Sequence, residues 1–169
     1  MYFQYCPDCG QKLKKKEIGD EGMVPWCENC KKPWFAMFST CVIGLVINEY
    51  REVALLRQSY ISEQYHNLVS GYMKPGETAE ETMTREIKEE IGITIQKLEF
   101  QGTYWYAKKD MLMIAFFAYA PKKDFVLSGE VNTAEWIPIE QVLSKVHPKG
   151  SVSYALMEAY FRKENSCQQ

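Results

Sequence analysis

Carboxylates are concentrated in one short stretch of the sequence, residues 71–93, which reads GYMKPGETAEETMTREIKEEIGI. Glu86, Glu89 and Glu90 stand at positions i, i+3 and i+4, so their carboxylates share one face of a helix. Like charges at this spacing repel, which favours a compensating cation. Carboxylate oxygens are the ligands that Mg²⁺ prefers. The spacing indicates a hard-cation site, although intrahelical ion pairs with Arg85 would suit the same composition.

The residues around this helix give it a start, an end and a docking face. Thr78, with Glu81 three residues later, predicts an N-terminal capping box, and Gly92 is a typical stop. The loop that begins at Gly71 precedes the helix N-terminus, where free N–H groups favour anions. The predicted helix is therefore 78–91. Its apolar stripe, which would dock on a sheet, consists of Ala79, Met83, Ile87 and Ile91.

Four cysteines near the N-terminus form a second motif. Cys6, Cys9, Cys27 and Cys30 are spaced as C-x2-C, seventeen residues and C-x2-C, which is typical of a four-thiolate zinc site. A segment this short cannot fold around an apolar core of its own, so zinc would have to stabilise it. A redox pair is the alternative for such a spacing. The motif predicts a structural zinc ribbon over residues 1–38.

Composition limits the classes of function. The chain has 169 residues, 46% hydrophobic content and a net charge of −2, which argues against a globally basic nucleic-acid binder. The basic stretch 12–16, KLKKK, is interpreted as a solvated hairpin tip, with an RNA contact as the alternative. No apolar run approaches the roughly 18 residues of a membrane span, and the N-terminus does not resemble a signal peptide. A cytoplasmic protein without a membrane partner is expected.

Beyond the ribbon, apolar patterning predicts a layered α/β domain over residues 39–165. Cys41 opens its first strand and is expected to be a buried core thiol. The predicted strands are 41–47, 52–58, 67–73, 93–106, 111–120 and 134–138, and the further helices are 139–146 and 151–163.

The acidic stretch fits the pattern G-x5-E-x7-R-E-U-x-E-E-x-G-U, where U is a bulky aliphatic residue. This pattern resembles the signature of the Nudix hydrolase family, the Nudix box, which here covers residues 71–93. The resemblance implies a Nudix α/β/α sandwich with a mixed sheet behind the zinc ribbon. The matching residues are Gly71, Glu77, Arg85, Glu86, Ile87, Glu89, Glu90, Gly92 and Ile93.

The chain is also similar to the zinc-ribbon-containing NADH pyrophosphatase branch, as a short form without the additional N-terminal domain. As in that branch, a four-cysteine motif precedes the box, Cys41 opens a strand, and Glu130 stands six residues before Trp136. The branch carries an S-Q-P-W-P-F-P motif after the box. Here the corresponding stretch reads GTYWYAKKD, in which only Trp105 lines up.

The resemblance implies hydrolysis of the pyrophosphate bond in a nucleoside diphosphate linked to another group, such as NAD(H), ADP-ribose or FAD. Arg85 would pair with Glu81 or Glu89 and position the acids, and Glu77 would act through a water or orient the loop. Glu130 is also the candidate general base. The implied Mg²⁺ or Mn²⁺ ligands are Glu86, Glu89, Glu90 and Glu130.

The implied substrate-binding residues are Gly71, Tyr72 and Trp105, the two aromatic rings by stacking on a base. Packing of either ring into the core is the alternative. Two other functions stay open: a nucleotide- or RNA-binding regulatory module, and removal of an NAD cap from RNA with the ribbon as the RNA contact. A nucleotide is the expected partner, RNA is less favoured, and a homodimer is expected from the zinc-ribbon relatives.

Overall fold

The structure, a computed structural model, describes residues 3–167 of the chain. The chain divides into two compact units between Ser39 and Thr40. In residues 3–167, no helix is both long and apolar enough to cross a bilayer.

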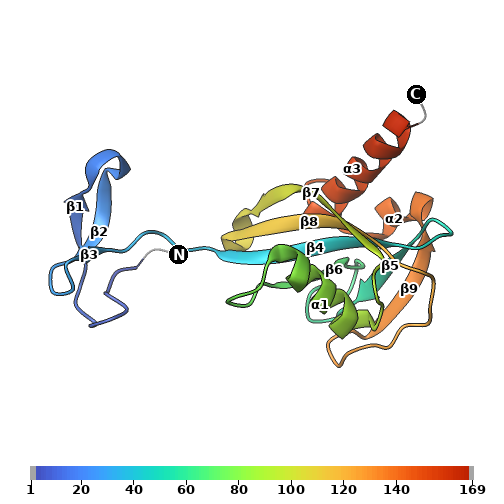
Figure 1. The fold of residues 1–169 in the computed structure, drawn as a ribbon, viewed down its shortest axis with the longest axis horizontal. Helices are drawn as coiled ribbons and strands as arrows, with labels where there is room; N and C mark the ends of the chain where they lie inside the picture. Colours follow the sequence, from blue (N-terminus) through green and yellow to red (C-terminus); the bar gives the residue numbers. More distant parts are fainter. Residues whose placement is uncertain (1–2, 168–169) are drawn as a thin grey trace. The chain divides into compact units, whose positions relative to one another are not determined.

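The first unit is a small three-stranded antiparallel sheet with strand order β1-β2-β3 (Figure 1). Between residues 3 and 39, the buried side chains are those of Cys6, Val24 and Cys27. Since two of these three are cysteines, the unit has almost no apolar core. Its elements are β1 (Lys14–Glu17), the 3-10 turn η1 (Gly19–Glu21), β2 (Met23–Cys27) and β3 (Lys32–Pro33).

The basic stretch of this unit is part of a strand, so the expected hairpin tip at residues 12–16 is wrong. Lys14, Lys15 and Lys16 are exposed residues of β1, and η1 forms the turn. Lys16 Nζ lies 3.7 Å from the centroid of the Trp26 ring on β2. The stretch is a strand because its backbone pairs with that of β2. The long stem of Lys16 covers the Trp26 indole while its charge stays in water.

The second unit is built on a six-stranded sheet with order β7-β8-β4-β5-β9, in which β6 also pairs with β4. The Ala120 N–H, just after β8, donates to the carbonyl of Ile47, the last residue of β4. These neighbouring strands therefore end together and run parallel, whereas β4–β5 and β7–β8 are antiparallel. The strands are β4 (Ser39–Ile47), β5 (Glu52–Arg57), β6 (Val69–Tyr72), β7 (Lys97–Tyr106), β8 (Met111–Tyr119) and β9 (Thr133–Pro138).

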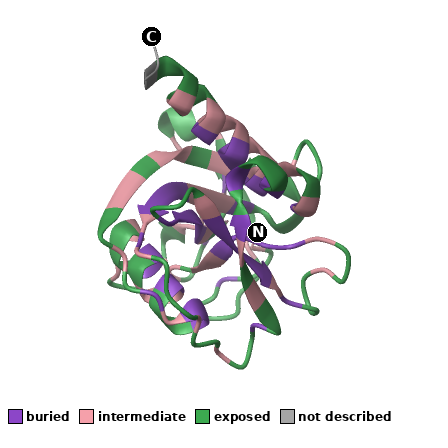
Figure 2. Ribbon diagram, turned by 90° about the vertical axis from the view of Figure 1, so that its right-hand side faces the viewer, coloured by how far each residue is buried: buried purple, intermediate pink, exposed green. Residues whose placement is uncertain are grey.

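Helices cover both faces of this sheet, which confirms the α/β class with a mixed sheet (Figure 1). Alternate residues of β4 face opposite sides: Val42 and Val46 pack with α1, while Ile43 and Leu45 pack with α2 and α3. Both sets are buried, and the central part of this unit contains most of the buried, purple ribbon in Figure 2. The helices are α1 (Ala79–Ile91), α2 (Ile139–Lys145) and α3 (Val152–Cys167), and a 3-10 turn, η2 (Ala107–Lys109), joins β7 to β8.

The acidic helix α1 has the predicted ends and docking face. Thr78 Oγ1 accepts the Glu81 N–H at 3.2 Å, and Glu81 Oε2 accepts the Thr78 N–H at 2.8 Å, which is the capping box. Gly92 ends the helix with a left-handed φ of 73°. A Cβ on Gly92 would also lie 2.7 Å from Val126 Cβ, so the stop allows a loop to pack closely.

The predicted strand 93–106 is too long, because β7 begins only at Lys97. Lys97 pairs with Tyr119, the last residue of β8, so residues 93–96 have no neighbouring strand to extend along. Ile93 is nonetheless fully buried in the α1-side core. Residues 93–96 therefore form a connection between α1 and β7 that contributes Ile93 to the core.

Candidate active site and zinc centre

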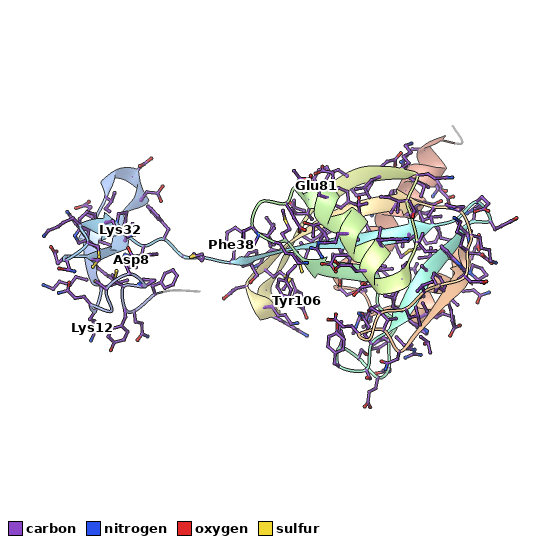
Figure 3. The ribbon with its side chains drawn as sticks, turned by 60° about the horizontal axis from the view of Figure 1, so that its bottom comes forward. Asp8, Lys12, Lys32, Phe38, Glu81 and Tyr106 are labelled. Atoms are coloured by element: carbon purple, nitrogen blue, oxygen red, sulfur yellow. The ribbon has the colours of Figure 1, made fainter. Side chains whose placement is uncertain are left out.

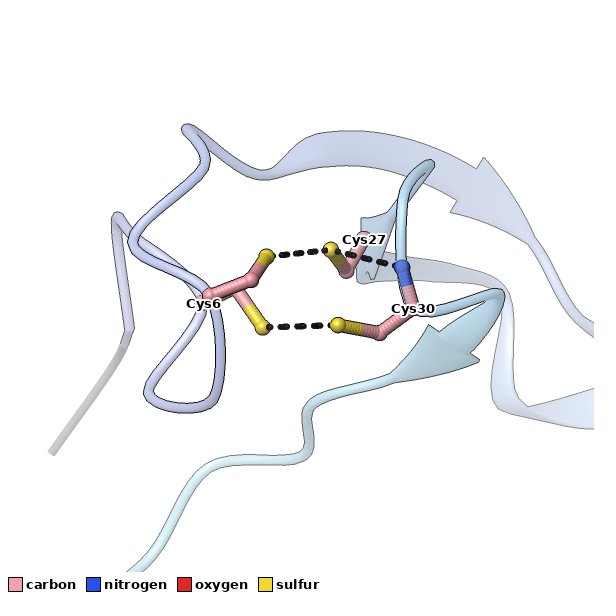
Figure 4. Close-up of side chains that lie close together, drawn as sticks. Cys6, Cys27 and Cys30 are labelled. Atoms are coloured by element: carbon pink, nitrogen blue, oxygen red, sulfur yellow. Dashed lines mark hydrogen bonds between the residues drawn. The ribbon is translucent and has the colours of Figure 1, made fainter.

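The four ribbon cysteines converge on one point (Figure 4). Their Sγ atoms all lie within 4.8 Å of one another, with Cys9 and Cys27 at 3.5 Å and Cys6 and Cys30 at 3.8 Å. Tetrahedral zinc with Zn–S bonds of about 2.3 Å places neighbouring sulfurs about 3.8 Å apart. In the described part of the chain these thiols form no disulfide. The geometry fits one zinc ion.

The electrostatics of the cluster also favour a cation. The Cys9 thiol, ahead of burial, raises the pKa of Cys30 to about 12. Burial opposes ionisation of Cys6, but the N–H groups of Cys9 and Asp8 outweigh it and lower the pKa of Cys6 to about 6. Asp8 also pairs with Lys32 (Figure 3). The thiols cannot all ionise side by side unless a metal ion compensates them.

In the second unit, Arg85 organises the carboxylates of α1. Its Nε and Nη2 donate to the two oxygens of Glu77 at 2.6 and 2.8 Å. Its Nη1 donates to Glu86 at 2.6 Å and to Glu89 at 3.0 Å, and Nη2 reaches the Tyr72 carbonyl at 3.2 Å. One guanidinium therefore fixes three carboxylates and the strand before the helix. Of the two expected partners, Glu89 pairs with Arg85, while Glu81 belongs to the capping box.

Glu77 is surrounded by donors and holds the loop ahead of α1. Besides Arg85, its Oε2 accepts from the Lys74 N–H at 3.1 Å and from Thr82 Oγ1 at 3.0 Å. The Arg85 guanidinium is the main cause that lowers the pKa of Glu77 to about 2. Glu77 therefore stays ionised, and its contacts suit the loop-orienting alternative.

Gly71 leaves room for Glu86. A Cβ on Gly71 would lie 2.0 Å from Glu86 Cδ, so the Glu86 carboxylate, at the end of a flexible side chain, would have to move. Glycine therefore lets the carboxylate keep its observed position by close approach and not by a special φ. A direct role of Gly71 in substrate binding stays a prediction.

Glu90 is the most buried carboxylate of the box, with 5% of its surface exposed. Its Oε1 accepts a hydrogen bond from Gln58 Nε2 at 2.9 Å, while its buried Oε2 has no partner among residues 3–167. Burial, with the charges of Glu86 and Glu130, outweighs the opposing hydrogen bonds from Gln58 and the Ser70 N–H and raises the pKa of Glu90 to about 7. An unpaired buried carboxylate oxygen is costly, so this site fits a divalent cation.

The loop between β8 and β9 brings a distant acid to this site. The Val126 N–H donates to the Ile91 carbonyl and the Ser128 N–H to the Glu90 carbonyl, both at 3.1 Å. The loop is thereby fixed to the end of α1. Glu130 follows on it, close enough for its charge to contribute to the raised pKa of Glu90. Its role as a ligand or general base stays a prediction.

The two aromatic residues expected to bind substrate are both half exposed. Tyr72, on β6, is 54% exposed, and Trp105, on β7, is 53% exposed. Neither ring is buried in the core of the unit. Stacking on a base stays a prediction for both.

Sequence reasoning missed two residues, Gln58 and Tyr60. Gln58 was included in a predicted strand, but it follows the end of β5 and is 1% exposed. Partial desolvation of its hydroxyl, with the charges of Glu130 and Glu90 next, raises the pKa of the Tyr60 phenol, although 68% of the residue is exposed. The hydroxyl therefore lies near the carboxylates. The available signal for Gln58 was a neutral polar residue at the end of a strand with an apolar centre.

Residues 37–159 match the family model described as the NUDIX domain. The chain belongs to the Nudix family. A crystal structure of a NUDIX hydrolase from Nitrosomonas europaea superposes with a TM-score of 0.70 at 18% identity, covering 96% of this chain and 93% of that one. This likeness confirms the fold.

Several named relatives align with nearly the whole Nudix chain but are longer. The NAD-capped RNA hydrolase NudC of Vibrio cholerae is 25% identical over 92% of this chain and 56% of NudC. The NAD(P)H pyrophosphatase NUDT13, mitochondrial, of Mus musculus is 27% identical over 92% of this chain and 44% of its own length. Nudix hydrolase 19, chloroplastic, of Arabidopsis thaliana is 32% identical over 95% of this chain and 36% of its own length. The chain thus spans about half or less of these relatives.

Replacing Cys27 with Ser should reduce bound zinc from about one equivalent to near zero, because three thiolates do not complete the tetrahedral site. Elemental analysis of purified protein measures this, and NMR line dispersion reports the fold of the ribbon. Cys41→Ala is the control, since Cys41 is a buried thiol of the other unit. Full zinc occupancy in Cys27→Ser would contradict the assignment.

Replacing Gly71 with Ala should weaken Mn²⁺ binding by about 10- to 100-fold, because the new Cβ displaces the Glu86 carboxylate. Paramagnetic resonance titration of Mn²⁺ measures the affinity. Gly129→Ala is the matched control, since a Cβ there meets no atom within 4 Å. Equal affinity in both variants would show that Glu86 does not need its observed position.

The raised pKa of Glu90 predicts a pH-dependent stability of the metal-free protein. A carboxyl whose pKa rises on folding from 4.5 to about 7 stabilises the fold below pH 4.5, and this contribution is lost as pH rises through 7. The loss amounts to about 3 kcal/mol. Urea unfolding with a chelator at pH 5 and pH 8 should show the fall in wild type but not in Glu90→Gln. Parallel pH profiles of the two proteins would refute it.

Proposed function

We propose that this chain hydrolyses the pyrophosphate bond of a nucleoside diphosphate linked to another group, with Mg²⁺ or Mn²⁺ as cofactor. The observation that carries the proposal is the buried, unpaired Oε2 of Glu90 beside the Arg85-ordered acids, within residues 3–167. A dinucleotide such as NAD(H) is the first candidate substrate, and ADP-ribose and FAD are the next. The names of the NudC and NUDT13 relatives, which refer to NAD-type dinucleotides, support this order.

The chain's residues divide the work of this reaction. Glu86, Glu89, Glu90 and Glu130 would hold the cation, which would neutralise the pyrophosphate and activate a water. Arg85 keeps Glu86 and Glu89 in place through its Nη1 hydrogen bonds. Burial makes Glu90 costly to ionise, so cation binding there is coupled to proton release. Glu130 is exposed on its loop, which also suits its alternative role, in which it would take a proton from the attacking water instead of binding the cation.

Tyr72 and Trp105 would contact the base or nicotinamide, because both rings are accessible. The stretch around Trp105 lacks the prolines associated with the nicotinamide dinucleotide. ADP-ribose and FAD therefore belong in the same substrate panel as NADH.

Removal of an NAD cap from RNA is a second candidate activity. The NudC relative carries this activity in its name, and β1 of the ribbon presents three exposed lysines, Lys14, Lys15 and Lys16. Neutralising these lysines should then reduce cleavage of capped RNA and leave cleavage of the free dinucleotide unchanged. Equal loss on both substrates would argue against an RNA contact in the ribbon.

We propose further that the protein is a cytoplasmic homodimer that holds one structural zinc per chain. The cysteine geometry supports the zinc. A set of thiols without disulfides, in the described residues, suits a reducing compartment. The dimer is proposed by analogy with the zinc-ribbon branch, and light scattering of purified protein tests it.

Glu89→Gln and Glu90→Gln should each reduce Mg²⁺-dependent release of a mononucleotide more than about 100-fold, since even outer groups around a metal cost 10- to 100-fold. Chromatography of reactions with NADH, ADP-ribose and FAD measures the products. Glu80→Gln, an exposed acid in the first turn of the same helix, is the control. Full activity in the two variants, or tight ligand binding without turnover in wild type, would favour the regulatory-module alternative.

A further inference from the structure

Gln58 makes a buried hydrogen bond to Glu90, a carboxylate of the Nudix box that Arg85 does not contact. It lies just after β5 and is 1% exposed, while Glu90 stands next to the last residue of α1. Gln58 Nε2 donates to Glu90 Oε1 at 2.9 Å and lies 3.4 Å from the Tyr60 hydroxyl. Thus the amide nitrogen is satisfied, and it selects one of the two Glu90 oxygens.

The two remaining oxygens of this pair are both unsatisfied. Gln58 Oε1 and Glu90 Oε2 are buried, and neither has a hydrogen bond of normal geometry within residues 3–167, although the Ser70 N–H lies close enough to the Glu90 carboxylate to lower its pKa. A hydrogen-bonded pair that served only to join β5 to α1 would not need two spare acceptors, since each unpaired buried acceptor costs free energy. What completes the pair must bring positive charge or protons.

Several hydrogen bonds fix the backbone that carries Gln58. The Gln58 main-chain carbonyl accepts the N–H groups of Ile61 and Ser62 at 2.9 and 3.1 Å. On either side of Gln58, Asn132 donates its N–H to the Arg57 carbonyl, and its Oδ1 accepts the Ser59 N–H, each at 2.8 Å. These bonds hold the backbone in place, and the side chain itself is held by its burial and its hydrogen bond to Glu90.

Asn132 also connects this turn to the second acidic loop. It stands two residues after Glu130 in sequence and binds the backbone on both sides of Gln58. The residues that approach Glu90 from β5 and from the β8–β9 loop are therefore fixed to each other.

We propose that Gln58 is a positioning residue for Glu90: it holds Oε1 so that Oε2 stays directed at the divalent cation. Its own Oε1, buried without a partner in residues 3–167, would accept a hydrogen bond from a water at the cation site. A divalent cation satisfies Glu90 Oε2, and a water is small enough and has the proton that Gln58 Oε1 lacks. The inference rests on the proposed function only in that the same cation site would serve hydrolysis.

The test is Mn²⁺ affinity without substrate, measured by paramagnetic resonance in wild type, Gln58→Met and Gln58→Asn. Met keeps the length and loses the amide, and Asn keeps the amide and loses its reach. Each should bind Mn²⁺ about 10- to 100-fold more weakly with circular dichroism and melting close to wild type. Gln64→Met, an exposed residue of the same loop, is the control and should bind as wild type.

A double-mutant cycle separates positioning from a merely structural role. In a Glu90→Gln background, Gln58→Met should have little further effect on Mn²⁺ affinity, because both changes act on one carboxylate. Wild-type affinity in either folded Gln58 variant, or additive losses in the cycle, would overturn the inference. Should Gln58→Met fail to fold, Gln58→Asn alone decides it, and should both fail, the hydrogen bond is structural and the inference is wrong.

Turnover keeps this inference distinct from the proposed function. With an active substrate, the folded Gln58 variants should lose kcat about 10- to 100-fold while KM changes little. Weakened Mn²⁺ binding without turnover of any substrate in wild type would defeat the proposed function but uphold the positioning role. If wild type turns over a substrate and the Gln58 variants keep its Mn²⁺ affinity and kcat, the proposed function stands and the positioning role is wrong.

Discussion

The apolar stripe of α1 and its acids cannot be placed independently. Glu86 and Glu90 each precede a buried stripe residue, Ile87 and Ile91, so docking the stripe on the sheet carries both carboxylates against protein. Other features of the site accommodate these two carboxylates. A glycine at position 71 makes room for Glu86, and the Gln58 amide meets Glu90.

Arg85 explains why the acids do not all behave alike. Its guanidinium donates to Glu77, Glu86 and Glu89, and it leaves Glu90 to the neutral amide of Gln58. The pKa of Glu77 is therefore well below its ordinary value while that of Glu90 is well above it. Within one short segment, Glu77 thus anchors the loop through its donors, while Glu90 keeps a buried oxygen that a cation could bind.

The two units owe their stability to different forces. The Nudix unit has apolar clusters on both faces of its sheet, which is the usual source of stability for a domain. The ribbon has one buried valine and two buried cysteines among residues 3–39, so apolar burial contributes little to its stability. The cluster of four sulfurs could hold a metal ion, and the proposed zinc would supply the missing stabilisation.

Local spacing was sufficient for much of this protein. The helix ends, the apolar stripe, the shared face of Glu86, Glu89 and Glu90, and the zinc motif all follow from positions a few residues apart, where helix and knuckle geometry is nearly fixed by the chain itself. The family pattern lies within 23 residues for the same reason.

The tertiary structure decided what depends on loops and partner strands. Residues 93–96 are not a strand because β8 ends opposite Lys97, and the lysines of β1 are in a strand because β2 lies beside them. The approach of Gln58 and Glu130 to Glu90 depends on two loops that pack on the end of α1. Spacing along the chain carries no such information, because loop paths are set by long-range packing.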